Sequence, residues 1–242
     1  MKDLAGQIAV ITGASSGVGK AIAVSLAKEG ASLCLVGRKL ATLEAVAESV
    51  RGSAPQVRNY QADLAVDADI QQLAVHLNRD MGHIDILVHS AGVISIGKLE
   101  NAPIQDFDWQ YRVNVRGPYL LTQTLLPLIK GCRGQIVFIN SSQGLSAKGN
   151  VGPYAATKHA LKAIADSLRE EVNSEGVRVL SMFLGRTATP MQTAVCQMEG
   201  RAYHPELLLQ PEDIAAMVIN ILTLPRTAEV TEISIRPLIK SY

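Results

Sequence analysis

Short apolar runs rich in valine and isoleucine recur along the chain between longer segments of helical periodicity. The runs predict strands at residues 7–11, 32–36, 56–60, 84–89, 135–140, 177–183 and 229–235. The longer segments predict helices at residues 18–29, 40–51, 67–81, 104–130, 152–175 and 211–223. Interior runs without polar alternation indicate a parallel sheet with helices on both faces. The pattern therefore predicts an α/β, doubly wound, three-layer fold with a seven-stranded parallel sheet.

Two segments depart from this regular pattern. Gly117 and Pro118 interrupt the periodicity of residues 104–130, so we expect a kink or break there. Residues 185–210 have no clean period and contain glycine, proline and threonine, which predicts a long loop or lid. Residues 1–242 as a whole are expected to form a single domain, because this length fits one large α/β sheet.

Composition and charge exclude several classes of protein. Hydrophobic residues make up 48% of the chain and charged residues 19%, which is typical of a globular protein. The net charge is +1 and neither sign forms a long block, so we expect no nucleic-acid and no membrane partner. The chain begins directly in a strand pattern, without a signal-peptide layout or a long apolar run, which predicts a cytoplasmic location.

The cysteines and histidines give no sign of a metal site. Cys34, Cys132 and Cys196 are odd in number and widely spaced, which argues against a disulfide framework and against bound zinc. The five histidines lack a metal-ligand spacing. We therefore expect no catalytic metal.

A glycine-rich turn, TGASSGVG at residues 12–19, joins the first predicted strand to the first predicted helix. Glycine permits close backbone approach, and the unpaired amides and dipole at a helix start favour a diphosphate. Strand, turn and helix in this order indicate a Rossmann-type dinucleotide site, although the spacing is GxxxGxG rather than GxGxxG. The alternative is a turn that only lets strand and helix pack closely. The turn's expected cofactor-binding residues are Gly13, Ser15, Ser16, Gly17, Val18 and Gly19.

The end of the second predicted strand favours NADP(H) over NAD(H). NAD-binding folds often place an acid here for the ribose hydroxyls, whereas this chain has Arg38 and Lys39. A carboxylate would repel a 2′-phosphate, and the Arg38 guanidinium can pair with it bidentately. The alternative, a solvated helix start, would not explain the missing acid.

The strongest chemical signal is the pair Tyr154 and Lys158, four residues apart on one face of a predicted helix. Carbonyl reduction needs a hydride and a proton, and a phenol with a pKa of about 10 is a poor base near neutrality. An ammonium a few ångströms away contributes up to about 4 kcal/mol, which is enough to lower the phenol pKa to a useful range. The pair therefore predicts a general acid/base.

Two polar residues are candidates to complete the catalytic group. Ser141 follows the fifth predicted strand, where its hydroxyl can donate to the substrate oxygen or serve only as a strand-end cap. Asn114 lies in an apolar helical stretch and must find hydrogen-bond partners there. A structural role and a catalytic role for Asn114 are equally open from the residue alone.

At these residues the sequence resembles the short-chain dehydrogenase/reductase family over nearly its whole length. The resemblance implies that the glycine turn binds the cofactor diphosphate and that Ser141, Tyr154 and Lys158 form the catalytic group. It also implies that Asn114 completes a proton relay through water and Lys158, and that Lys158 holds the nicotinamide ribose hydroxyls. The family's spacing of thirteen residues before the tyrosine selects Ser141 over Ser142. A tetramer or dimer is implied too.

Further cofactor contacts follow from the resemblance, with two departures from its pattern. Asp63 and Leu64 match the adenine-contacting pair, and Arg38 matches a position associated with NADP. The usual Asn-Asn-Ala-Gly is His-Ser-Ala-Gly at residues 89–92, so we expect a structural or cofactor role for His89. The usual Pro-Gly is Leu184-Gly185. The remaining expected cofactor contacts are Ala91, Gly92, Gly185, Thr187 and Thr189.

The sequence thus predicts an NADP(H)-dependent oxidoreductase that interconverts a secondary alcohol and a carbonyl. The alternative is a non-catalytic NADP(H)-binding regulator or redox sensor with the same fold. An extended sugar epimerase is disfavoured by the short segment after the sixth strand. The substrate stays open, because Met191, Met198 and Tyr203 make the lid apolar whereas Arg186, Arg201 and His204 offer partners for a carboxylate.

Overall fold

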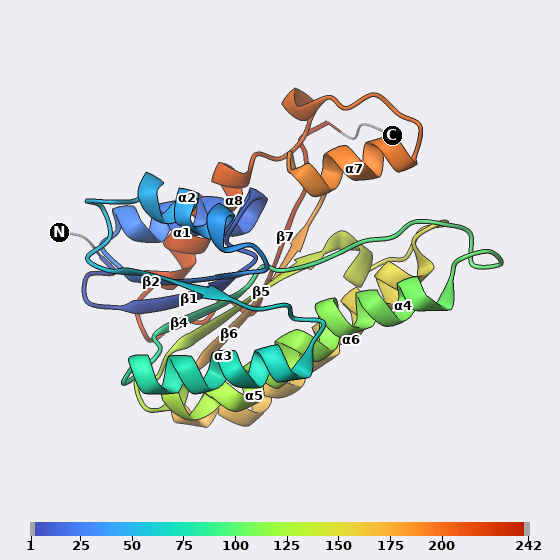
Figure 1. The fold of residues 1–242 in the computed structure, drawn as a ribbon. Coiled ribbons are helices and arrows are strands. Elements are labelled where there is room, and N and C mark those ends of the chain that lie inside the picture. The colour runs from blue at the N-terminus through green and yellow to red at the C-terminus, as the bar shows by residue number, and fades with distance from the viewer. Residues whose placement is uncertain (1–2, 240–242) are drawn as a thin grey trace.

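The computed structural model describes residues 3–239, which form one seven-stranded sheet between two layers of helices (Figure 1). All neighbouring strands are parallel, in the order β3-β2-β1-β4-β5-β6-β7. The predicted doubly wound fold and its seven parallel strands are confirmed. The strands are β1 Ile8–Thr12, β2 Ser32–Gly37, β3 Val57–Gln61, β4 Ile86–His89, β5 Gln135–Ser141, β6 Arg178–Leu184 and β7 Glu232–Ile235.

Helices cover both faces of the sheet, as the continuous apolar strands predict (Figure 1). One face carries α1 Gly17–Lys28, α2 Leu40–Ser49 and α8 Pro211–Leu222. The opposite face carries α3 Asp67–Asp80, α5 Gly117–Lys130 and α6 Gly152–Val172. Successive β1 residues alternate between the two cores, with Ile11 in the first and Val10 in the second.

The helical segment expected at residues 104–130 consists of α4 Ile104–Tyr111, a π-helical turn Arg112–Arg116 and α5, so its hydrogen-bond pattern changes next to the interruption expected at Gly117 and Pro118. The backbone stays in the right-handed helical region at Arg116 and Gly117, so the helix continues through the π-turn into α5 without a free end. The π-turn contains Asn114, whose side chain bonds to the loop after β4.

The segment expected to be a long loop at residues 185–210 contains a helix, α7 Pro190–Met198, and a 3-10 turn, Pro205–Leu207. Thr189 caps α7 by accepting a hydrogen bond from Gln192 N at 3.2 Å. Figure 1 shows α7 above the carboxyl ends of the strands, so this segment does cover that edge of the sheet. None of the helices in residues 3–239 has the length and apolar character of a membrane span.

Candidate active site

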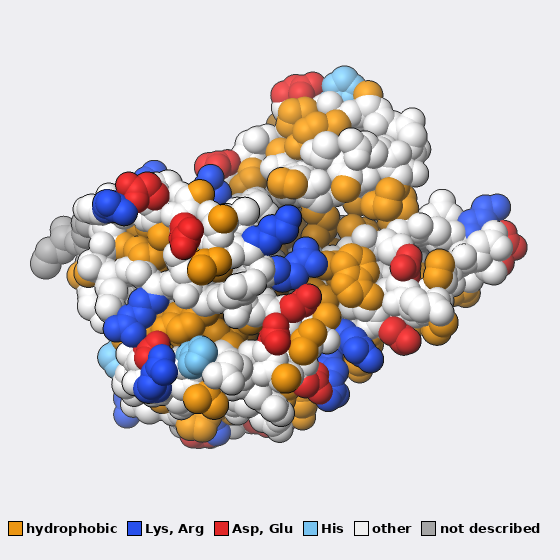
Figure 2. All heavy atoms as spheres, viewed as in Figure 1, with side chains coloured by type: hydrophobic (Ala, Val, Ile, Leu, Met, Phe, Trp, Pro, Cys, Tyr) orange, Lys and Arg blue, Asp and Glu red, His pale blue; other side chains and the backbone are white. Residues whose placement is uncertain are grey.

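A cleft of about 370 Å³ opens at the carboxyl ends of the strands. Its walls come from the loops after β1 to β6, from α6 and from the α7 segment. Figure 2 shows the hollow below α7, with hydrophobic side chains along it and Lys and Arg side chains at one side. Ligands of doubly wound sheets bind at this edge.

The glycine turn forms a backbone cradle at the floor of the cleft. A Cβ at Gly19 would lie 2.4 Å from the Gly13 carbonyl oxygen, and a Cβ at Gly13 would lie 2.8 Å from the Ala91 backbone. Only glycine fits at these contacts, so the first turn of α1 sits directly against the strand ends. The amides of that turn, which lack intrahelical partners, face the space that a diphosphate requires. This part of the chain fits a dinucleotide.

The other expected nucleotide contacts lie along the same cleft. Arg38 follows β2 with an exposed side chain, and its carbonyl accepts a hydrogen bond from Gln61 Nε2 at 3.0 Å. Asp63 and Leu64 follow β3 and line the adjoining wall. Asp63 is held at both ends, since its amide donates to Asp69 Oδ2 and its Oδ1 accepts from Ala65 N. A basic group and a fixed acid thus flank the glycine turn.

The expected catalytic side chains meet at the centre of the cleft. Tyr154 and Lys158, in the first turns of α6, are both buried and lie beside Ser141 at the end of β5. Burial raises the pKa of Tyr154 to about 12, while a hydrogen bond with the Ser141 side chain acts in the opposite direction. The sequence-based expectation is a lowered pKa for Tyr154, whereas in this structure the pKa of Tyr154 is raised, because desolvation of the buried phenol is the largest effect on it.

Lys158 lies over the face of the Tyr154 ring. Its Nζ lies 5.8 Å from the centre of the tyrosine ring and donates to the Ile139 carbonyl at 3.1 Å. Burial lowers the pKa of Lys158 to about 8. A group with this pKa exchanges protons readily near neutral pH.

Asn114 is buried and does not line the cleft directly. Its Oδ1 accepts from Val93 N at 2.8 Å, and its Nδ2 donates to Val93 O at 2.9 Å and to Thr157 Oγ1 at 3.1 Å. The side chain thereby joins the loop after β4 to α6, next to Lys158. These hydrogen bonds give Asn114 a structural role, and they hold it next to the expected catalytic residue Lys158.

The glycine cradle and the Ser141, Tyr154 and Lys158 group have counterparts in known proteins. The family model for short chain dehydrogenase matches residues 7–200. The chain belongs to this family.

Related short-chain dehydrogenases cover nearly the whole chain. An uncharacterised oxidoreductase of Staphylococcus epidermidis is 36% identical over 96% of this chain and 97% of its own length. The alcohol dehydrogenase of Thermococcus sibiricus complexed with 5-hydroxy-NADP has a TM-score of 0.89 at 26% identity and covers 98% of both chains. L-sorbose reductase of Gluconobacter frateurii, complexed with NADPH and L-sorbose, has a TM-score of 0.87 at 26% identity, covering 96% of this chain and 95% of its own.

His89, at one of the two departures from the short-chain dehydrogenase pattern, is buried away from the cleft. Its ring stacks on Phe138 at 4.9 Å between centroids, and its Nε2 is 2.8 Å from Thr122 Oγ1 on α5. The structure therefore gives this side chain a structural place, outside the described residues that line the cleft. Thr12, at the end of β1, joins β1 to the loop after β4. Its Oγ1 accepts hydrogen bonds from the amides of Ser90 and Ala91.

The lid of this short-chain dehydrogenase carries the other departure. Gly185, Thr187 and Thr189 line the cleft, together with Ala91 and Gly92 opposite them. A Cβ at Gly185 would lie 2.9 Å from Pro237 Cδ, so the chain after β6 passes close to the segment after β7. The lid, residues 185–210, is therefore held in place at its first residue by this packing, although the turn has Leu184 where the family usually has proline.

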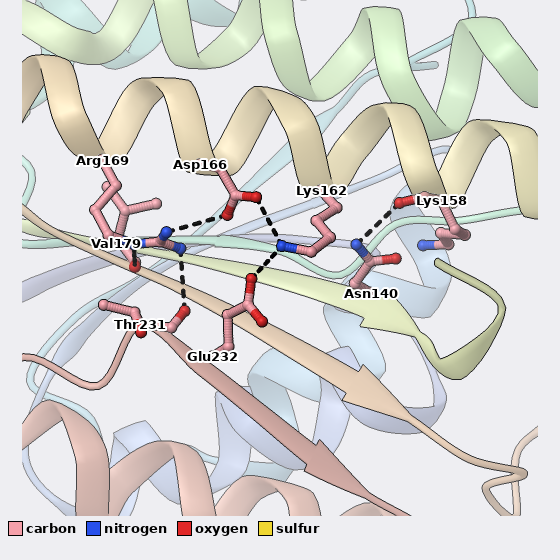
Figure 3. Close-up of polar contacts among 8 residues, drawn as sticks. All are labelled: Asn140, Lys158, Lys162, Asp166, Arg169, Val179, Thr231 and Glu232. Carbon is pink, nitrogen blue, oxygen red and sulfur yellow. Dashed lines mark hydrogen bonds and ion pairs between the residues drawn. The ribbon is translucent and has the colours of Figure 1, made fainter. Parts of the chain in front are cut away.

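Sequence reasoning did not identify Asn140 as part of the candidate site. Its Oδ1 accepts from the Ser141 amide at 2.8 Å. Its Nδ2 donates to the Lys158 carbonyl at 3.1 Å (Figure 3). One buried amide thus links the backbones of two expected catalytic residues. The sequence shows Asn140 as a polar residue near a strand end, but only the fold reveals that it bonds to the backbone of Lys158.

Sequence reasoning also did not anticipate the pairing of Glu199. Its two oxygens accept hydrogen bonds from Arg186 Nη2 at 2.8 and 2.9 Å, and both side chains line the cleft. Thirteen residues separate the partners, a spacing with no periodic signature. Arg186, which the sequence offers as a partner for a substrate carboxylate, thus already binds a carboxylate of the protein.

Proposed function

We propose that this chain is an NADP(H)-dependent oxidoreductase that interconverts a secondary alcohol and a carbonyl by hydride transfer, with Tyr154 as general acid/base. The proposal rests above all on the convergence of Ser141, Tyr154 and Lys158 beside a glycine cradle in one cleft. Membership of the short-chain dehydrogenase family supports the reaction class.

A bound nicotinamide supplies the hydride for the carbonyl carbon or accepts it from the alcohol. Tyr154 then holds the proton: with a pKa of about 12 the phenol is protonated at neutral pH and ready to donate to a carbonyl oxygen. The Ser141 hydroxyl orients that oxygen beside the phenol. Lys158, with a pKa of about 8, returns a proton towards Tyr154, and Asn114 fixes the loop and helix that surround it.

The preference for NADP(H) rests on the end of β2. Arg38 and Lys39 follow β2 directly, at the place where NAD-binding folds often carry an acid for the ribose hydroxyls, and a guanidinium suits a 2′-phosphate. Several solved structures similar to this chain are complexes with NADP or NADPH. These observations support NADP(H) as the preferred cofactor.

Steady-state oxidation of NADPH and NADH with a panel of ketones, aldehydes and quinones tests the proposal. We expect NADPH oxidation with at least one carbonyl, a loss of roughly a hundredfold or more in kcat for Tyr154→Phe, and unchanged NADPH affinity. Tyr119→Phe, at an exposed position on α5, is the matched control and should keep full activity. Cofactor binding without turnover by any panel member would favour the regulator or redox sensor instead.

Three expectations from the sequence remain predictions: a homodimer or homotetramer, a cytoplasmic location, and a small-molecule substrate without nucleic-acid or membrane partners. Light scattering coupled to gel filtration measures the first, and fractionation of the source cells measures the second. An absence of binding to DNA, RNA and lipid vesicles at physiological salt would support the third.

A further inference from the structure

The cationic side chains that line the cleft decide which substrates it attracts. Among the described lining residues these are Arg38, Lys158 and Arg186. Arg38 follows β2 and Arg186 follows β6. These two strands are four strand spacings apart in the sheet, a distance of about 19 Å. Lys158 is buried over the face of the Tyr154 ring. Arg186 is therefore the cation placed to meet a charged group on a substrate.

Arg186 lies at the substrate end of the cleft. Ser141 pairs with Leu184 in the β5–β6 register, and Arg186 follows Leu184 by two residues. Its backbone is anchored, because its carbonyl accepts from Leu209 N at 3.1 Å. Its side chain thus occupies the wall of the cleft beyond the expected catalytic serine.

The charge of Arg186 is already engaged. Glu199, at the end of α7, accepts two hydrogen bonds from Arg186 Nη2 and lines the same wall. A second guanidinium, Arg201, lies 3.7 Å from the Glu199 carboxylate but does not line the cleft. A substrate carboxylate approaching Arg186 would therefore meet the Glu199 carboxylate as well, and like charges at such a distance repel.

Apolar side chains form much of the remaining wall, beside Gln143 and Gln192. Ile94, Val151, Met191 and Val195 come from three different segments and line the cleft with Tyr154. An uncharged body of a substrate would bury apolar surface against them.

We propose that the cleft selects uncharged carbonyl substrates, and that Glu199 excludes carboxylates by occupying Arg186. This inference rests on the proposed function and specifies its substrate class. Removing the Glu199 charge should convert Arg186 into a carboxylate-binding residue.

Two aldehydes that differ at a site remote from the carbonyl test the proposal: methyl 4-formylbenzoate and 4-carboxybenzaldehyde. We expect the wild-type protein to give a kcat/KM at least tenfold higher for the ester. In Glu199→Gln the ratio of acid to ester kcat/KM should rise roughly tenfold or more, because the freed guanidinium gains a charged hydrogen-bond partner. In the double variant Arg186→Gln/Glu199→Gln the ratio of acid to ester kcat/KM should fall below that of Glu199→Gln, because the guanidinium is gone. Glu206→Gln, another lid glutamate that does not line the cleft, should leave the ratio unchanged.

The comparison separates this inference from the proposed function. Equal wild-type use of acid and ester, or an unaltered ratio in Glu199→Gln with ester turnover retained, would overturn the selection by Glu199. Calorimetric titration of the NADP⁺-saturated protein with each aldehyde gives the same comparison without turnover. Tighter binding of the ester that disappears in Glu199→Gln, with no turnover of either compound, would support the selection and count against the enzymatic proposal alone.

Discussion

Replacing Lys158 with methionine tests whether the active site holds this ammonium at the expense of stability. Burial lowers the pKa of Lys158 from 10.5 to about 8. At pH 7 this difference corresponds to about 3 kcal/mol of folding free energy, since one pKa unit is worth about 1.4 kcal/mol. The hydrogen bond to the Ile139 carbonyl returns about 1 kcal/mol. Lys158→Met should therefore raise the free energy of unfolding by about 2 kcal/mol.

The pH dependence gives this prediction its sign. Below pH 8 the folded and unfolded chains both carry the proton, so the whole cost of burial is present. Between pH 8 and 10.5 the unfolded chain keeps a proton that the folded chain has lost, and wild-type stability rises with pH from this group. The advantage of Lys158→Met should accordingly be largest near pH 7 and disappear near pH 10.5.

Thermal unfolding followed by circular dichroism from pH 6.5 to 10.5 measures the effect. We expect the Tm of Lys158→Met to exceed that of the wild type by about 4–8 °C at pH 7, with most turnover lost. Lys162→Met is the matched control one turn along α6 (Figure 3). Asp166 and Glu232 hold the pKa of Lys162 above its usual value, so its removal should lower the Tm. A Tm below that of the wild type for Lys158→Met, or a gain independent of pH, would refute the reasoning.

Three further substitutions address the cofactor and the framework of the site. Arg38→Asp should reduce the ratio of NADPH to NADH kcat/KM by roughly tenfold or more, and an unchanged ratio would exclude a phosphate contact by Arg38. Asn140→Ala should cost about 2–3 kcal/mol in chemical denaturation and lower kcat, because it removes two buried hydrogen bonds; Asn220→Ala, exposed on α8, should do neither. Gly19→Val should abolish calorimetric binding of NADPH, since its Cβ would collide with the Gly13 carbonyl, and retained affinity would argue against the cradle.

The parts of the site that the sequence predicts are those encoded by local spacing. Tyr154 and Lys158 lie four residues apart, so any helix brings them to one face. The glycine turn follows directly on a strand pattern, and Ser141 ends another. Because parallel strands place their carboxyl ends at one edge, these short signals are sufficient to assemble the cleft.

The parts that escaped prediction depend on contacts between distant segments. The Arg186 and Glu199 pair, the Asn140 bridge and the stacking of His89 on Phe138 each join residues without a periodic relation. The sequence also did not predict that the pKa of Tyr154 is raised, because this too depends on the folded structure. The sequence identifies the ammonium, but only the fold determines that burial of the phenol dominates.

The side chains expected to act in catalysis and those of the lid are held in place by different parts of the fold. Helix α6 is fixed to the sheet along its length, by Asn140 at Lys158, by Glu232 of β7 at Lys162 and by the Val179 and Thr231 carbonyls at Arg169 (Figure 3). Because α6 carries Tyr154, these contacts between the helix and the sheet determine the position of its side chain. The wall that we propose contacts the rest of the substrate includes α7, whose C-terminal end is attached to the loop after β6 through the Arg186 and Glu199 pair. Substitutions in the contacts of α6 should thus change kcat and stability together, whereas substitutions in α7 should change KM and the choice of substrate at nearly constant stability.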